Sequence, residues 1–166
     1  MYYVAHILVS GRPEMDFPLY MILLSLTGNL FIGGLEEAGW SYILQPGIDR
    51  KCGYALSSAV VGIIWLLWHV PLFFIPGTAH YEGLIDFWMF AVQIIEFRFF
   101  YGAICRIAGK SSVFMCVLFH SMFNAASSVV GILPMTWRGT IVANTAVSFI
   151  AISAVIVHSE MNRRTV

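Results

Sequence analysis

Apolar residues run through this chain in long continuous blocks. Crossing the ~30 Å hydrocarbon core of a bilayer takes about 20 mostly apolar residues in a helix. Five blocks meet this length, and they cover approximately Phe17–Leu35, Tyr54–Ile75, Leu84–Ile107, Ser112–Leu133 and Thr140–His158. Proline and glycine mark the joints between them, at Pro46–Gly47, Pro76–Gly77, Gly109 and Pro134. The pattern therefore predicts about five transmembrane segments.

Helices are the expected form of these segments, because hydrocarbon cannot satisfy the backbone groups of an open strand. The apolar runs are continuous rather than alternating, which disfavours a β-barrel. No internal repeat, low-complexity tract or linker divides the chain. The sequence thus predicts an all-α, polytopic membrane helix bundle that forms a single domain, residues 1–166, with a motif-bearing core at about 28–128. Residues 1–9 lack the basic start of a signal peptide, so we expect an interfacial segment or the end of a helix there.

Composition supports a membrane protein. The 166 residues are 59% hydrophobic and only 11% charged, and the mean hydropathy is +0.81. A soluble domain carries about 25% charged residues. The net charge is zero, so no basic surface indicates a nucleic-acid partner. The three cysteines show no CxxC spacing, and we interpret Cys52, Cys105 and Cys116 as small apolar packing residues.

Basic residues gather on alternate loops. Six follow the first, third and fifth segments, namely Arg50, Lys51, Arg106, Lys110, Arg163 and Arg164. The opposite loops hold only Arg12 and Arg138. The positive-inside rule then places the C-terminus in the cytoplasm and the N-terminus outside. We expect an integral membrane protein, of the bacterial plasma membrane, with the lipid bilayer as its first partner.

The segment Trp40–Lys51 is more polar than the block before it. Aromatic and charged residues together suit the headgroup region of a bilayer. We interpret this segment as an interfacial, cytoplasmic extension of the first span.

Five polar residues interrupt the apolar blocks and carry the candidate chemistry: Glu36, Glu37, His69, His120 and Asn124. An ionisable group inside hydrocarbon costs roughly 2.5–3.5 kcal/mol on insertion scales, so such residues are usually functional. A carboxylate beside an imidazole can activate water. His120 and Asn124 lie one helical turn apart, where two donors can stabilise an oxyanion or form hydrogen bonds between helices. Together these residues indicate water-dependent chemistry inside a membrane.

The order and spacing of these residues resemble those of the CAAX endopeptidase and bacteriocin-processing (CPBP, or ABI) family of intramembrane proteases. That family shows EExxxR, FxxxH and HxxxN or HxxxD on successive membrane helices. Here Glu36-Glu37-Ala38-Gly39-Trp40-Ser41 is similar to the first motif, Trp65-Leu66-Leu67-Trp68-His69 to the second and His120-Ser121-Met122-Phe123-Asn124 to the third.

The resemblance implies hydrolysis of a peptide bond in a membrane-associated protein or peptide, near the cytoplasmic face. Glu36 and His69 would activate water, His120 and Asn124 would hold the oxyanion, and Glu37 would support Glu36. Eukaryotic members act on prenylated CAAX substrates, and a bacterial member is expected to process a bacteriocin-like peptide or a membrane protein. The family has been described both as metalloproteases and as glutamate-dependent enzymes. No metal or other cofactor is certain, and the alternative is a divalent ion such as zinc on Glu36, His69 and His120.

One position departs from the family pattern, because Ser41 stands where the first motif has arginine. Arg50 or Arg98 is a candidate to replace that arginine in space. The alternative to an active enzyme is therefore an inactive membrane scaffold or an immunity-type member of the same family.

Other functions use fewer of these residues. Two histidines can ligate a haem, and buried acids can relay protons in a transporter, but a haem leaves Glu36 and Glu37 unused.

We expect Glu96 to pair with Arg98 or Arg106. We expect three further histidines, His6, His80 and His158, to be solvated or interfacial.

Overall fold

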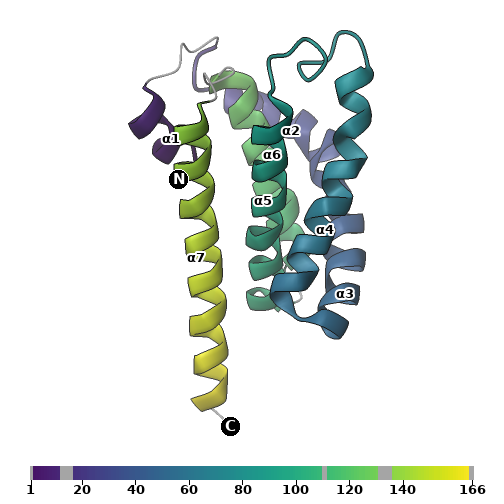
Figure 1. The fold of residues 1–166 in the computed structure, drawn as a ribbon, viewed down its shortest axis with the longest axis vertical. Helices are drawn as coiled ribbons and strands as arrows, with labels where there is room; N and C mark the ends of the chain where they lie inside the picture. Colours follow the sequence, from purple (N-terminus) through teal and green to yellow (C-terminus); the bar gives the residue numbers. More distant parts are fainter. Residues whose placement is uncertain (1, 12–16, 110–111, 131–135, 165–166) are drawn as a thin grey trace.

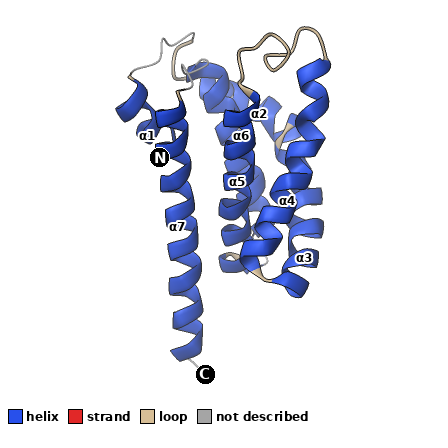
Figure 2. Ribbon diagram, in the orientation of Figure 1, coloured by secondary structure: helices blue, strands red, loops and turns tan. Residues whose placement is uncertain are grey.

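The computed structural model describes residues 2–11, 17–109, 112–130 and 136–164 (Figure 1). These residues form seven α-helices and three shorter helical turns, and Figure 2 draws no strand among them. The α-helices are α1 (Tyr2–Ser10), α2 (Met21–Ile32), α3 (Gln45–Cys52), α4 (Tyr54–His69), α5 (Phe87–Ile107), α6 (Ser112–Val130) and α7 (Trp137–Arg164). The turns are the 3-10 turn η1 (Gly34–Glu36), the π-helix η2 (Ala38–Leu44) and the 3-10 turn η3 (Val70–Phe74).

The predicted all-α membrane bundle is confirmed. Four helical segments are long and apolar enough to cross a membrane: Tyr54–Phe74, Phe87–Ile107, Ser112–Val129 and Trp137–Arg164. The helix of the third predicted block, Phe87–Ile107, begins three residues later than the apolar pattern predicts, because the Asp86 side chain accepts a hydrogen bond from the Met89 N–H (2.9 Å) and caps the helix. The predicted end of the fourth block at Leu133 lies outside the described residues.

The first apolar block differs from the other four. Its α-helix, α2, has only 12 residues, and the chain then continues through η1, η2 and α3 instead of one long helix. Gly33 and Gly34 lie at the end of α2, where both are buried. A π-helix has a wider turn and is found most often at functional sites. The break places Glu36 and Glu37 on successive short turns inside the bundle.

Helix packing brings the central segments together around α5. This helix packs between α4 and α7, while α6 packs on α2 and α1 packs on the first part of α7 (Figure 1). At the α4–α5 contact a Cβ on Gly62 would lie 3.0 Å from the Ile95 Cα, so the absence of a side chain lets the two backbones approach closely.

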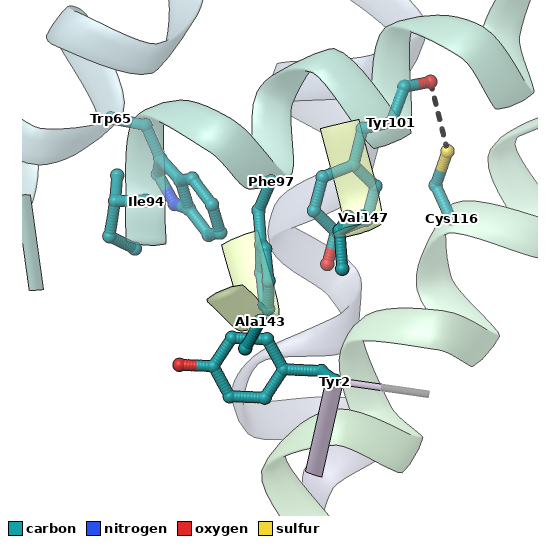
Figure 3. Packing of buried hydrophobic residues seen from close by; sticks show 8 residues of the cluster. All are labelled: Tyr2, Trp65, Ile94, Phe97, Tyr101, Cys116, Ala143 and Val147. Carbon is teal, nitrogen blue, oxygen red and sulfur yellow. Dashed lines mark hydrogen bonds between the residues drawn. The ribbon is translucent and has the colours of Figure 1, made fainter. Parts of the chain in front are cut away.

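The core of the bundle is mainly aromatic. Figure 3 shows Phe97 and Tyr101 of α5 between Trp65 of α4 and Val147 of α7. Tyr2 of α1 lies edge-on to Phe97, with ring centroids 5.4 Å apart. Such edge-to-face contacts fix ring orientations as well as burying area. The short N-terminal helix is therefore part of the core.

The described basic residues of the alternate loops lie at one end of the bundle. Figure 1 shows the ends of α3, α5 and α7 at this lower end. The Arg106 guanidinium of α5 bonds the Asp49 carboxylate of α3 at 2.9 and 3.0 Å. The α4–α5 connection, residues 75–86, lies at the upper end. Lys110 and Arg12 fall outside the described residues.

The segment Trp40–Lys51 is not wholly interfacial. Ser41 and Gln45 are each 1% exposed, and the Gln45 side-chain amide donates to the hydroxyls of Ser57 (3.1 Å) and Ser58 (3.2 Å) on α4. These two side chains therefore pack inside the bundle and do not lie on its surface; Ser41 belongs to the π-helix η2 and Gln45 begins α3. Tyr42, in contrast, is exposed.

The orientation expected from the basic residues can be tested with cysteines at the two ends. Cys52 is exposed at the end of α3, and Tyr81 is exposed in the loop at the other end. In inside-out vesicles a membrane-impermeant maleimide should label Cys52. In right-side-out vesicles it should label only Tyr81→Cys, made in a Cys52→Ser background. The reverse pattern would contradict a cytoplasmic C-terminus.

Candidate active site

A buried ion pair joins the break in the first block to the middle of α5. Arg98 Nη1 lies 3.1 Å from Glu37 Oε2, and both side chains are completely buried. Ser41 connects the pair, because its hydroxyl donates to the Glu37 carboxylate and accepts from Arg98 Nη2 (2.9 Å). Arg98 thus places a guanidinium beside Glu37. Of the two arginines considered from sequence, Arg98 is the one that contacts Glu37 among the described residues.

Two aromatic rings surround the Arg98 guanidinium. Its Cζ lies 4.4 Å from the Tyr101 ring centroid and 5.1 Å from that of Trp65. Cation–π contacts of this kind are worth about 2 kcal/mol when they are desolvated. A buried ion pair is costly to form, and hydrogen bonds and ring contacts offset part of that cost. The surroundings therefore hold the guanidinium in one position.

Glu37 also orients a motif histidine. Its Oε1 accepts a hydrogen bond from His120 Nδ1 at 3.0 Å. A carboxylate can only accept, so Nδ1 carries the proton and Nε2 points away from the pair. The resemblance assigned Glu37 to the support of Glu36, whereas its side-chain partners here are Arg98, Ser41 and His120.

Glu36 occupies a different environment from Glu37. It is half-buried, and its Oε2 accepts the indole N–H of Trp40 (3.2 Å) and of Trp65 (3.3 Å). Neutral donors hold the carboxylate without neutralising its charge. One glutamate is therefore paired with a cation and the other is available at a cavity surface.

His69 lies at the last residue of α4. Its Nδ1 is 2.8 Å from the Trp65 carbonyl oxygen, so Nδ1 carries the proton and Nε2 has a free lone pair in the neutral ring. The ring stands edge-on to Trp65, with centroids 5.4 Å apart, and Trp65 is also 5.5 Å from the His120 ring. One tryptophan side chain therefore contacts both imidazoles and Glu36.

Asn124 and His120 meet at the backbone of Gly33. A Cβ added to Gly33 would lie 2.4 Å from Asn124 Nδ2 and 3.2 Å from His120 Nε2. The two nitrogen atoms therefore converge on one position beside the helix break. Any side chain at position 33 would occupy the space they share.

A cavity of about 370 Å³ connects these groups. Its size falls in the range of ~300–1,000 Å³ typical of ligand sites. Four of the five residues predicted from sequence line it, namely Glu36, His69, His120 and Asn124, while Glu37 lies behind His120. Aromatic side chains of α1, α5 and α6 form much of the remaining wall.

The cavity extends toward the upper end of the bundle. His80 and Ile85 of the α4–α5 loop line it, and this loop lies opposite the end where α7 finishes (Figure 1). The sequence placed both the C-terminus and the substrate at the cytoplasmic face. Neither expectation is tested by the fold, which places the α4–α5 loop residues of the cavity wall and the end of α7 at opposite ends of the bundle.

Several residues of the site were missed or assigned other partners. Trp40 and Gly33 were missed, and a tryptophan four residues after Glu36 was the available signal for Trp40. Trp65, which belongs to the second motif, also bonds Glu36. Glu96 does not pair with Arg98 or Arg106, because the Ser148 hydroxyl of α7 donates to it. Among the cysteines Cys116 is buried in the packing, but Cys52 is exposed and fills no core position.

The described residues do not assemble a metal site. No group of three or more His, Cys, Asp or Glu side chains among them is placed to hold one ion, although catalytic zinc usually has three protein ligands. Glu36 instead accepts from two indoles. The alternative ligand set of Glu36, His69 and His120 therefore does not fit this arrangement, and we derive no step through a metal.

A bundle of membrane-length helices with carboxylate, imidazole and amide groups around one internal cavity has the features of a membrane-embedded hydrolase. The comparisons narrow this class. Residues 18–126 match the model of the Rce1-like family, described as type II CAAX prenyl endopeptidase Rce1-like, and the chain belongs to that family. The resemblance identified from the motifs is confirmed.

One curated relative is CAAX prenyl protease 2 of Methanococcus maripaludis, which is 24% identical over 146 residues. The alignment covers 86% of this chain and 49% of the relative. The chain thus spans about half the length of the curated relative it matches. No solved structure matches the chain.

Removing one partner of the Glu37–Arg98 pair should strongly destabilise the fold. Arg98→Met leaves a buried carboxylate without its cation, and we expect a loss of about 3–5 kcal/mol in unfolding free energy. Glu37→Gln/Arg98→Met should recover much of that loss, because neither charge is then left unpaired. The control is Arg106→Met, which breaks a partly exposed pair and should cost about 0–1 kcal/mol. Equilibrium unfolding in detergent gives the unfolding free energy of each of these three variants. Equal losses for Arg98→Met and Arg106→Met would contradict the prediction.

Proposed function

We propose that this chain is an intramembrane endopeptidase that hydrolyses a peptide bond of a membrane-associated protein or peptide. Glu36 and His69 activate water, and His120 and Asn124 stabilise the oxyanion. The observation that carries the proposal is the convergence of these four side chains on one cavity of about 370 Å³. Family membership supports a CAAX-type protease in general.

Water activation follows from the two free acceptors at the cavity wall. The His69 Nε2 lone pair accepts a hydrogen bond from the water, since Nδ1 is engaged by the Trp65 carbonyl. The Glu36 carboxylate takes the proton as the water oxygen forms a bond to the scissile carbonyl carbon. The indole N–H groups of Trp40 and Trp65 hold the carboxylate in place during this transfer.

Oxyanion stabilisation follows from the nitrogens that meet at Gly33. As the carbonyl π electrons move to oxygen, Asn124 Nδ2 donates one hydrogen bond and His120 Nε2 donates the second. In that role His120 is an imidazolium, since Nδ1–H is already donated to Glu37. At this stage Glu36 holds the proton from water, so the Glu37 carboxylate and the oxyanion balance the Arg98 guanidinium and the His120 imidazolium, and zero net charge favours this state in a medium of low dielectric constant.

Collapse of the tetrahedral intermediate completes the reaction. The oxyanion reforms the carbonyl, the C–N bond breaks, and its electron pair remains on the leaving nitrogen. Glu36 returns the proton to that nitrogen, so a peptide and one water yield one carboxylic acid and one amine. The carboxylate is regenerated for the next cycle.

The position of Arg98 favours an active enzyme over the inactive scaffold or immunity-type alternative. Loss of the motif arginine at Ser41 would leave Glu37 without a cation and His120 without a fixed partner. Arg98 supplies that charge from α5 at 3.1 Å. The departure from the motif is therefore compensated in space.

The cavity geometry also favours one entrance. We propose that the substrate enters past the α4–α5 loop, between residues of α1 and η3 that also line the cavity. The labelling experiment described above determines which membrane face this is. If the C-terminus is cytoplasmic, cleavage occurs toward the opposite face.

Glu36→Gln should abolish most of the activity while leaving the fold intact, because glutamine cannot take the proton from water. The assay uses protein in proteoliposomes and a panel of quenched fluorescent peptides, namely a farnesylated CAAX peptide, the same peptide without farnesyl, and a membrane-anchored peptide. We expect the rate to fall about 10²–10⁴-fold. The control is Glu96→Gln, a glutamate of α5 that bonds Ser148 and does not line the cavity. Equal rates for wild type and Glu36→Gln would refute the mechanism, and no cleavage by wild type of any peptide would favour the inactive alternative.

Gly33→Ala should act on the oxyanion donors alone. The new Cβ would meet Asn124 Nδ2 at 2.4 Å, and displacing one such donor costs about 10²–10³-fold in kcat. Gly28→Ala on α2 is the matched control, because a Cβ there has no neighbour within 4 Å. Steady-state cleavage of the same peptides gives kcat and KM for each variant. A Gly33→Ala enzyme with the kcat of Gly28→Ala would show that the two nitrogens do not serve the reaction.

A further inference from the structure

Two histidines that the mechanism does not use also line the cavity. His6 lies on α1 and His80 lies in the α4–α5 loop. The His6 side chain is 1% exposed, so its interpretation as a solvated or interfacial residue is wrong. His80 is half-buried, while His158 is a half-buried residue of α7 whose Nε2 contacts the Asn162 amide.

Both cavity histidines have buried nitrogens without a partner. Within the described part of the chain, neither His6 ring nitrogen makes a hydrogen bond, and His80 Nε2 also makes none. Buried polar atoms nearly always have partners, and an exception needs a physical explanation, of which a bound group that supplies the missing hydrogen bonds is one. These three nitrogens lie on residues that face the cavity where the substrate is proposed to bind.

Packing holds both rings in fixed orientations. His6 lies so close to Gly139 of α7 that a Cβ there would approach its Nδ1 to 2.8 Å. His80 stands edge-on to Phe73 (4.8 Å between centroids) and to Phe90 (4.9 Å). Groups that are already oriented bind a ligand without a further entropic cost.

The chemistry of this wall favours an uncharged ligand with both donors and acceptors. Burial lowers the pKa of His6 and His80, so each imidazole is neutral near pH 7 and offers one donor and one acceptor. No lysine or arginine is among the described residues that line the cavity, so an anion would find no compensating charge. A peptide main chain presents N–H and C=O groups in alternation and fits this pattern.

We propose that His6 and His80 form a subsite that hydrogen-bonds the main chain of the bound peptide away from the scissile bond and so determines which peptide bond reaches Glu36. This inference rests on the proposed endopeptidase function. His6 lies outside the segment that matches the family, residues 18–126. The subsite therefore adds a substrate contact from a helix that the family match does not include.

The first test measures binding without cleavage. In a Glu36→Gln background, the Kd of each fluorescent peptide of the panel is measured with and without His6→Phe. Loss of one neutral hydrogen bond should raise Kd by about 3–10-fold, and His6→Asn, which keeps a donor and an acceptor, should restore part of the affinity. His80→Phe should act in the same direction, which keeps the test valid if a His6 variant does not fold. His158→Phe is the matched control and should leave Kd unchanged.

The second test identifies the main-chain partner. Single amide-to-ester replacements along the peptide remove one N–H at a time. At one position the ester should weaken binding to the protein with His6 but not to His6→Phe, because the lost bond is the same in both cases. In otherwise wild-type enzyme His6→Phe should raise KM by the same factor and move the cleavage position measured by mass spectrometry, with kcat within about 2-fold.

The outcomes separate the two proposals. Unchanged Kd, KM and cleavage position for folded His6→Phe and His80→Phe, with normal loss of activity in Glu36→Gln, would overturn the subsite alone. Unchanged cleavage by Glu36→Gln would overturn the catalytic assignment, while a Kd effect of His6→Phe would still support the subsite. Absence of binding by every peptide of the panel would overturn both.

Discussion

The buried pair between Glu37 and Arg98 is the interaction on which the rest of the site depends. Two charges 3.1 Å apart with no exposed surface are stable only when each finds further partners. Ser41, His120, Trp65 and Tyr101 provide them, and these come from four different segments of the chain. The same requirement therefore draws η2, α4, α5 and α6 together and fixes the orientation of His120. The burial of this pair and the orientation of His120 therefore have one physical origin.

The first apolar block is not one continuous helix: α2 is followed by η1 and η2, and this break lets Glu37 and Ser41 meet Arg98. A continuous helix would present Glu36 and Glu37 about 100° apart on one cylinder. The 3-10 turn followed by a π-helix changes the register over a few residues, and Gly33 allows His120 and Asn124 to approach the backbone closely. Adjacent glutamates thus occupy unlike environments, one paired with a cation and one held by neutral indoles. That difference allows them to have different roles.

Aromatic side chains give the cavity its shape and separate the polar groups from one another. Trp65 contacts Glu36, His69, His120 and Arg98. The ring contacts extend through Phe97 and Tyr2 to α1 (Figure 3), so the short N-terminal helix contributes to the wall opposite the motifs. The substrate subsite proposed at His6 and His80 depends on this wall. The same segments that enclose the cavity also bring unpartnered imidazole nitrogens to the cavity wall.

The sequence by itself determined the helical class, four of the spans and the polar residues of the cavity. Each of these depends on local chemistry: apolar length sets a span, and a polar residue in hydrocarbon needs a reason to be there. Tertiary structure alone decided that Arg98 pairs with Glu37, that Glu37 accepts from His120, that Glu96 bonds Ser148 and that His6 is buried. These contacts join residues 52 to 83 positions apart or lie between separate helices. Periodicity along one segment carries no information about which face of another segment it will meet, and the low dielectric of the interior then selects the charge partners.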